Sequence, residues 1–165
     1  MRKILRISSV LSWINLIIWG LLCAFVLLGA LVLGNLAFLI ALVFPSAVVL
    51  HSYAALQLHK SVRDPAVPLS SQTPTGIRFI GFVALFVGIS NLFSGVTIIQ
   101  NSREIIQQLQ SQIPPEMKNF KFKEVHIHTL GIITLLVGLS VVVNANLNFR
   151  LLRQYYSSRE KKDNP

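Results

Sequence analysis

The sequence predicts an all-α integral membrane protein, with four transmembrane helices arranged as two antiparallel hairpins in a four-helix bundle. Hydrophobic residues make up 53% of the chain and charged residues only 13%, which is about half of the ~25% usual in soluble domains. The charges are also segregated, because residues 7–59, 79–102 and 125–149 contain no Asp, Glu, Lys or Arg. A bilayer core needs about 20 apolar residues per helix. The first stretch is therefore long enough for two helices, and the other two for one each.

The first uncharged stretch predicts helices over residues 7–33 and 36–59, separated by a turn at Gly34-Asn35. The apolar run is longer than the ~7–15-residue apolar region of a signal peptide, so we expect the first helix to be retained as an anchor. Pro45 lies inside the second helix and should kink it. Cys23 is the only cysteine, which excludes an internal disulfide and a cysteine metal cluster.

The remaining elements follow from proline placement and charge. Residues 60–76 hold three prolines and predict a cytoplasmic loop, after which a third helix is expected over 77–100. Residues 101–127 form an outer connector with a short amphipathic helix over 102–113, where Asn101 and Glu104 have capping-box spacing. A fourth helix is expected over 128–152, followed by a charged cytoplasmic tail over 153–165.

The distribution of Lys and Arg predicts the orientation. Of the 15 basic residues, eleven flank the side that holds both termini and the 60–76 loop, and four lie in the outer connector. Cytoplasmic segments retain Lys and Arg, so both termini should be cytoplasmic in a plasma membrane, as in small bacterial inner-membrane proteins. The net charge of +9 therefore does not indicate nucleic-acid binding, since no folded basic domain remains to carry it.

A repeated motif predicts how the third and fourth helices pack. GFVALFVGIS begins at Gly81, and GIITLLVGLS begins at Gly131. In lipid, small residues let helix backbones approach closely, and an Asn or Thr side chain can form a hydrogen bond to the neighbouring helix. We expect a left-handed antiparallel seam at heptad-like spacing. It comprises Gly81, Ala84, Gly88, Asn91, Gly95, Gly131, Thr134, Gly138 and Ala145. An inverted transporter repeat is the alternative, but convergent packing explains the motif more simply.

Polar residues at membrane depth are the candidate functional residues. Asn15, His51 and Asn144 lie at similar predicted depth and could converge as an intramembrane cluster. Such a cluster would serve as a proton relay or small-ligand site, or would hold a neutral His by hydrogen bonding, which we favour. No Asp or Glu lies within a span, which argues against a proton-driven exporter of the type that depends on a membrane-embedded Glu.

Glu124, His126 and His128 form a weaker candidate at the outer face. In an extended segment these alternating residues would share one side and could ligate a transition metal. If a helix begins at His128, the three side chains no longer share one side. The ligand set is also incomplete. We therefore expect no metal site and no cofactor.

The sequence favours a structural or interaction role, such as an accessory subunit of a membrane complex. The expected partners are the lipid bilayer and either a second copy of the chain or a larger membrane complex. The alternative is a small oligomeric transporter or channel that uses the Asn/His cluster. An enzyme is not expected, because the chain has no Gly-rich phosphate loop, nucleophile elbow or CxxC motif. An outer-face enzyme using Glu124, His126 and His128 is the least favoured hypothesis.

Overall fold

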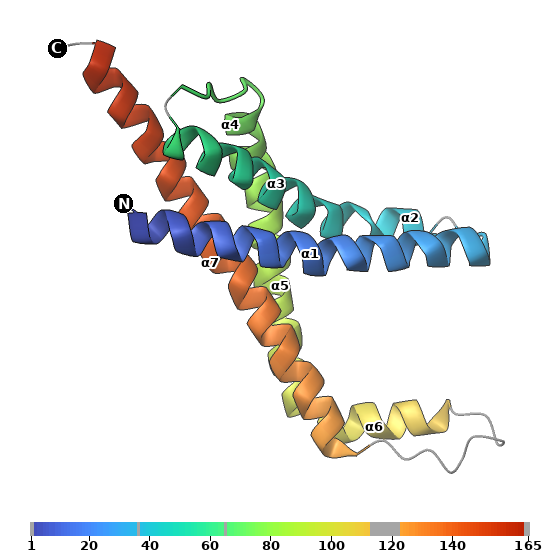
Figure 1. Ribbon diagram of the computed structural model, residues 1–165. Coiled ribbons are helices and arrows are strands. Elements are labelled where there is room, and N and C mark those ends of the chain that lie inside the picture. Colours follow the sequence, from blue (N-terminus) through green and yellow to red (C-terminus); the bar gives the residue numbers. More distant parts are fainter. Residues whose placement is uncertain (1, 36, 65, 113–122, 164–165) are drawn as a thin grey trace. The chain divides into compact units, whose positions relative to one another are not determined.

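The structure is helical over the part of the chain that it describes (Figure 1). This computed structural model describes residues 2–35, 37–64, 66–112 and 123–163, except for the side chains of residues 2 and 159–163. Four helical segments are long and apolar enough to cross a membrane: Lys3–Leu33, Ala37–Arg63, Thr73–Gln100 and Glu124–Ser158. The predicted all-helical class and the four membrane-length helices are confirmed.

The chain divides into two compact units, which are described separately. Unit 1 comprises Met1–Val87 and Ser140–Pro165, and unit 2 comprises Gly88–Leu139. Two helices, α5 (Gly81–Gln100) and α7 (Glu124–Asp163), contribute residues to both units.

Unit 1 begins with a hairpin of α1 (Arg2–Leu33), α2 (Ala37–Ala41) and α3 (Val43–Arg63), in which α1 and α3 lie side by side and antiparallel (Figure 1). The turn depends on Gly34, whose φ of 60° lies in the left-handed region that glycine adopts without a Cβ clash. The Asn35 side chain then accepts a hydrogen bond of 2.9 Å from the Ala37 N–H. This local Asx turn starts the return of the chain.

Pro45 coincides with an interruption between α2 and α3 at Leu42. Proline has no N–H, so the carbonyl of Ala41 lacks its usual helical donor. The Ser46 hydroxyl donates to the Leu42 carbonyl at 2.6 Å and to the Val43 carbonyl at 3.0 Å. The expected single helix over 36–59 is therefore two helical segments, and the second continues to Arg63.

The loop between the second and third spans is shorter than expected. Helix α4 (Thr73–Thr75) and a π-helical turn, η1 (Gly76–Ile80), lead directly into α5. The third helical segment thus begins at Thr73 rather than at 77. Pro74 lies in the first turn of this segment, where its missing N–H has no intrahelical partner to lose.

Helix α6 (Ser102–Ser111) follows α5 and is amphipathic, with Ile105, Ile106 and Leu109 less exposed than the charged and amide residues between them. The Asn101 side chain makes no capping hydrogen bond, so the expected capping box does not form. The predicted end of this helix at 113 and the connector over 113–122, with Pro114-Pro115, lie outside the described residues.

Helix α7 is longer than the predicted 128–152 helix, because it begins at Glu124 and continues to Asp163. The predicted tail over 153–165 is thus helical as far as Asp163. The prediction ended helices at charged residues, which mark the boundary of an apolar span. Charged residues such as Arg, Lys and Glu are themselves good helix formers, so they need not end the helix. The same reason places the start of α1 at Arg2 rather than at residue 7.

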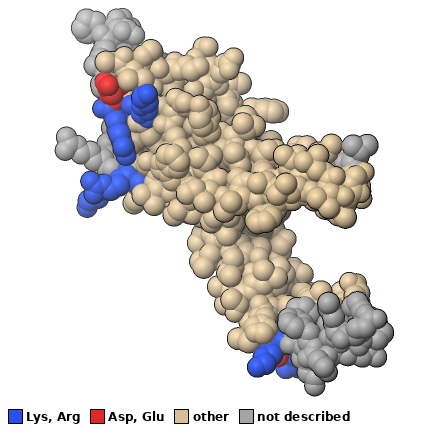
Figure 2. Space-filling model, turned by 45° about the vertical axis from the view of Figure 1, so that its right-hand side comes forward, with Lys and Arg blue, Asp and Glu red and all other residues tan. Residues whose placement is uncertain are grey.

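The apolar core of unit 1 lies where α1, α3, η1 and α7 meet. Its buried members are Leu5, Ala54, Leu58, Ile77, Leu151, Leu152 and Tyr155. Away from this core, many large apolar side chains are exposed, including most of those in the distal half of α1, where Trp19 and Ala30 are buried. Figure 2 shows blue Lys and Arg side chains gathered at one end of this unit, with uncharged residues over the rest of its visible face.

Candidate functional site

A ladder of buried polar side chains joins α1, α3 and α7 in unit 1. Its members are Ser8, Ser12 and Asn15 on α1, His59 on α3, and Ser140, Asn144 and Asn148 on α7. We call this set the polar ladder. All of these side chains are buried except that of Ser140, which is half-buried.

The rungs of the polar ladder run between antiparallel helices. The Ser8 hydroxyl donates to the Asn148 Oδ1 at 2.8 Å, and the Ser12 hydroxyl donates to the Asn144 Oδ1 at 3.0 Å. In the third rung, the Ser140 hydroxyl donates to the Asn15 Oδ1 at 2.6 Å. Residue numbers increase along α1 where they decrease along α7, as expected for antiparallel helices. Within each helix the ladder residues are three, four or eight positions apart and therefore share one face.

Further hydrogen bonds connect the rungs. The Asn148 side-chain amide donates to the Asn144 Oδ1 at 3.1 Å, one turn away on the same helix. The Asn15 amide reaches the Ser140 carbonyl oxygen at 3.4 Å. The ladder is therefore a connected network over part of its length, and most of its buried oxygens have donors.

His59 closes the ladder at one end. Its Nε2 lies 2.9 Å from the Asn148 Oδ1 and 3.0 Å from the Ser8 hydroxyl. An amide oxygen can only accept, so the tautomer with hydrogen on Nε2 lets His59 donate to Asn148. Ser8, His59 and Asn148 thus bring α1, α3 and α7 together at one point.

The expected cluster of Asn15, His51 and Asn144 does not form as predicted. All three residues are buried, but Asn15 bonds to Ser140, and Asn144 bonds to Ser12 and Asn148. Neither ring nitrogen of His51 has a hydrogen-bond partner among the described residues. Its ring packs instead near Phe149, with ring centroids 6.2 Å apart. The histidine of the network is His59, not His51.

Sequence reasoning missed His59 and Ser8 for two reasons. His59 directly precedes Lys60, so its position suggested the end of a span rather than a helix interface. On α1, predicted depth indicated Asn15 alone, whereas the structure also buries Ser8 and leaves Ser9 half-buried. Their spacing could have identified this face of α1, because Ser8, Ser12 and Asn15 are four and three residues apart and therefore lie on the same side of a helix.

The glycine-rich motifs of α5 and α7 meet in unit 2. A Cβ built on Gly138 would lie 2.8 Å from the Gly88 carbonyl oxygen and 2.9 Å from the Leu92 nitrogen. A Cβ on Gly95 would lie 2.9 Å from the Gly131 carbonyl oxygen. The pairs 88–138 and 95–131 have the register of antiparallel helices, and their backbones touch. We call these four glycines the glycine seam.

The other predicted seam residues have different neighbours. In unit 1, Ala84 and Ala145 are fully buried, and a Cβ on Gly81 would meet the rings of Phe149 and His51 at 2.8 and 2.9 Å. In unit 2, the Asn91 Cβ lies against Gly138. The Thr134 hydroxyl donates within its own helix, to the Leu130 carbonyl at 2.9 Å.

Two of the three outer-face residues come together in unit 2. The Ser102 hydroxyl lies 3.2 Å from the Glu124 Oε1 and 3.0 Å from the His128 Nε2, and Arg103 pairs with Glu124 at 3.4 Å. His126 lies on a different side because the segment is helical from Glu124, so the extended arrangement that the weak metal candidate required does not occur. No group of three His, Cys, Asp or Glu suited to a metal occurs among the described residues.

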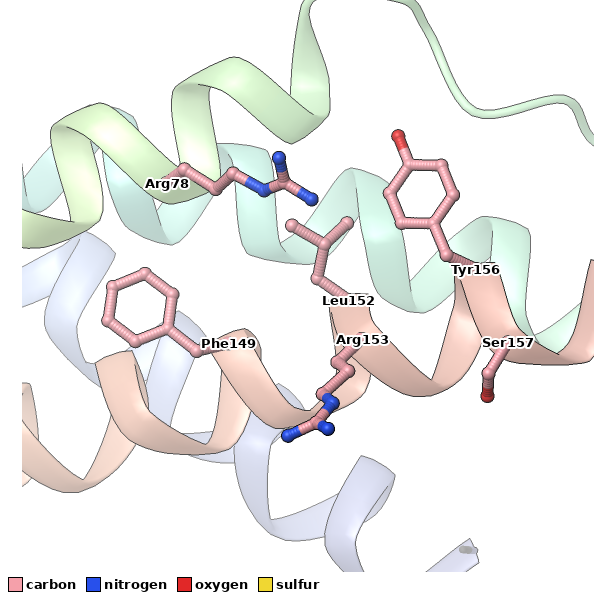
Figure 3. Close-up of a pocket in the computed structure, with 6 residues that line it drawn as sticks. All are labelled: Arg78, Phe149, Leu152, Arg153, Tyr156 and Ser157. Carbon is pink, nitrogen blue, oxygen red and sulfur yellow. The ribbon is translucent and has the colours of Figure 1, made fainter.

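Two open cavities lie at the charged ends of helices. One, in unit 1, has a volume of about 740 Å³ and is lined by Arg78, Phe149, Leu152, Arg153, Tyr156 and Ser157 (Figure 3). The other, in unit 2, has a volume of about 450 Å³ and is lined in part by Ser102, Glu124 and His128. Neither cavity is lined by a residue of the polar ladder.

Comparison with known proteins gives no match: no protein family, no curated protein and no solved structure resembles the chain closely enough to be reported.

Proposed function

We propose that this protein is a four-span membrane protein of the plasma membrane that acts through its helix surfaces, as a structural or interaction protein such as an accessory subunit of a membrane complex. The observation that carries the proposal is the polar ladder. Its buried side chains bond mainly to one another, and none of them lines either open cavity. Polar side chains that hydrogen-bond across helix interfaces hold the helices together.

The outward surface supports the same proposal. Large apolar side chains of α1 are exposed on most of its length, including Phe25 at 70% and Leu31 at 72%. A surface of this kind is stable against lipid tails or against the apolar helices of another membrane protein. The excess of Lys and Arg around both termini supports a cytoplasmic location for those termini.

Native mass spectrometry of the full chain, extracted gently from its own host, tests the interaction role. We expect a reproducible complex with a larger membrane protein. A matched variant, Leu31→Ser, should reduce recovery of that complex if the exposed distal half of α1 makes the contact. A chain recovered only as a monomer, or only as complexes of itself, contradicts the accessory-subunit proposal.

A second candidate function, a small oligomeric transporter or channel, is favoured by His51. Its two ring nitrogens lack partners among the described residues although only 1% of the residue is exposed. Intramembrane ionisable residues commonly mark ion pathways. The test is flux in proteoliposomes: pH-dependent flux that is lost in His51→Ala and retained in Tyr53→Phe, on the same helix, would favour transport over the interaction role.

A further inference from the structure

The cavity of unit 1 combines cationic and aromatic groups at the edge of an uncharged span. Arg78 lies in η1, directly before the uncharged residues 79–102, and Arg153 lies on α7, just beyond the uncharged residues 125–149. Arg78 and Arg153 thus line the same cavity, each within a few residues of an uncharged stretch. In a bilayer, such residues lie at the level of the lipid headgroups.

The arginines of this cavity have no acidic partner within 4.0 Å among the described side chains. The Arg78 guanidinium lies over the Tyr156 ring, 5.9 Å from its centroid. In Figure 3 the guanidinium groups of Arg78 and Arg153 lie on either side of Leu152, and the Tyr156 hydroxyl is directed away from the helix. Guanidinium groups bind phosphate oxygens in a forked, charge-assisted geometry.

The floor of the cavity is apolar and continues along α5. Phe149 and Leu152 line it, and the Phe149 ring lies 5.5 Å from the ring of Phe82, centroid to centroid. Phe82 and Phe86 are 67% and 61% exposed and lie about one turn apart on α5. An amphiphile whose anionic group contacted an arginine of this cavity could therefore lay a hydrocarbon chain along these rings.

We propose that this cavity binds the phosphate headgroup of an anionic glycerophospholipid, with an acyl chain lying along Phe149 and Phe82. A volume of about 740 Å³ is within the range of ~300–1,000 Å³ typical of small-molecule sites and exceeds what a single phosphate ion needs. Basic pockets between transmembrane helices bind such headgroups in other membrane proteins. The site goes beyond the interaction role but rests on the proposed membrane location.

The test uses the full chain in a neutral detergent and measures binding by titration calorimetry. The probes are short-chain phosphatidylglycerol, short-chain phosphatidylcholine, glycerol phosphate and inorganic phosphate. We expect saturable binding of phosphatidylglycerol, and binding at least about tenfold weaker for phosphatidylcholine and for both free phosphates. Equal affinity for the two lipids would overturn the site. Inorganic phosphate that competes as well as phosphatidylglycerol would show an anion site without lipid specificity, which also overturns the proposal.

Arginine variants locate the site. Arg78→Gln and Arg153→Gln should each weaken phosphatidylglycerol binding about fivefold, as expected for one basic residue near an anionic headgroup. Arg150→Gln is the matched control, because Arg150 is exposed on the same helix but does not line the cavity. Equal losses in all three variants would indicate general surface charge and overturn the proposal.

A variant on the apolar floor of the cavity distinguishes binding of the headgroup from binding of the acyl chain. Phe82→Ala should weaken binding of the lipid while leaving that of glycerol phosphate unchanged, and an unchanged lipid affinity would remove the acyl-chain part of the proposal. The wild-type lipid comparison does not depend on how any variant folds. A result without lipid selectivity would overturn the lipid site but would not contradict the proposed membrane location. That location is tested by a separate experiment, the labelling of cysteines introduced on either side of a span.

Discussion

Three polar contacts in unit 1 converge on the Asn148 side chain. Its Oδ1 lies within hydrogen-bonding distance of Ser8 and His59, and its amide donates to Asn144. In the proposed membrane location no water would replace a lost partner, so these groups would depend on one another. In contrast, His51 lies eight residues earlier on α3 than His59 and takes no part in the network.

Replacing Asn148 with Ala should therefore destabilise the fold. The substitution removes the acceptor that joins the Ser8–His59 pair to α7, and leaves Asn144 without one donor. We expect the free energy of unfolding in detergent to fall by about 1–3 kcal/mol.

The matched control is Asn146→Ala. The Asn146 side chain is exposed and donates only to the Val142 carbonyl of its own helix, at 2.9 Å. Its replacement should change the free energy of unfolding by less than about 0.5 kcal/mol. Equal destabilisation by the two variants would mean that the ladder contributes nothing specific.

At the scale of elements, unit 2 depends on close backbone approach between α5 and α7. Apolar burial does little to drive helices together in lipid, so dispersion contact between backbones carries more of the association. The glycine seam provides that contact at Gly88–Gly138 and Gly95–Gly131. Three glycines of the repeated motif, Gly88, Gly131 and Gly138, lie at these contacts.

Gly138→Ala should destabilise the α5–α7 pair. The added Cβ would lie within 3.0 Å of backbone atoms at Gly88 and Leu92, which cannot move as a side chain could. We expect a loss of about 1–3 kcal/mol, seen as a lower midpoint of thermal unfolding.

Gly29→Ala is the control, because a Cβ there would meet nothing within 4 Å. Alanine is a better helix former than glycine by about 1 kcal/mol, so this variant should be unchanged or more stable. A Gly138→Ala protein that unfolds at the wild-type midpoint would show that the seam is not tightly packed.

The hairpin of α1 and α2 should be sensitive at Gly34 for a different reason. Nothing lies within 4 Å of a Cβ there, but the backbone has a φ of 60°. Gly34→Ala should cost about 1–2 kcal/mol in unfolding free energy through backbone strain. Gly34→Asn should cost less, because Asn tolerates the left-handed region. An Ala variant as stable as Gly20→Ala, which has no such φ, would contradict this explanation.

For the whole molecule, the proposed orientation can be tested by cysteine labelling. In a Cys23→Ser background, Ser70→Cys and Ser111→Cys place one thiol on each predicted side, at exposed positions. In intact cells, a membrane-impermeant maleimide should label Ser111→Cys. It should label Ser70→Cys only after permeabilisation. The reverse pattern would invert the topology, and equal labelling of both would contradict an odd number of spans between them.

The helical class and the number of membrane-length helices follow from the amino-acid sequence alone. Both depend on the length and charge of apolar stretches, which are local properties. The sequence also identified the glycines at which α5 and α7 touch, because small residues at heptad-like spacing mark close helix contacts. It placed the helix ends poorly, since charge marks a membrane boundary rather than the end of a helix.

Which polar residues meet depends on how the helices pack. Asn15, His51 and Asn144 have similar predicted depths, but a hydrogen bond also requires the right helix face and the right neighbouring helix. The register of α1 against α7 pairs Ser8 with Asn148 and Ser12 with Asn144, and the position of α3 brings His59 rather than His51 to them. These pairings join residues more than 80 positions apart. Periodicity within one helix cannot specify them, because they depend on how separate helices pack.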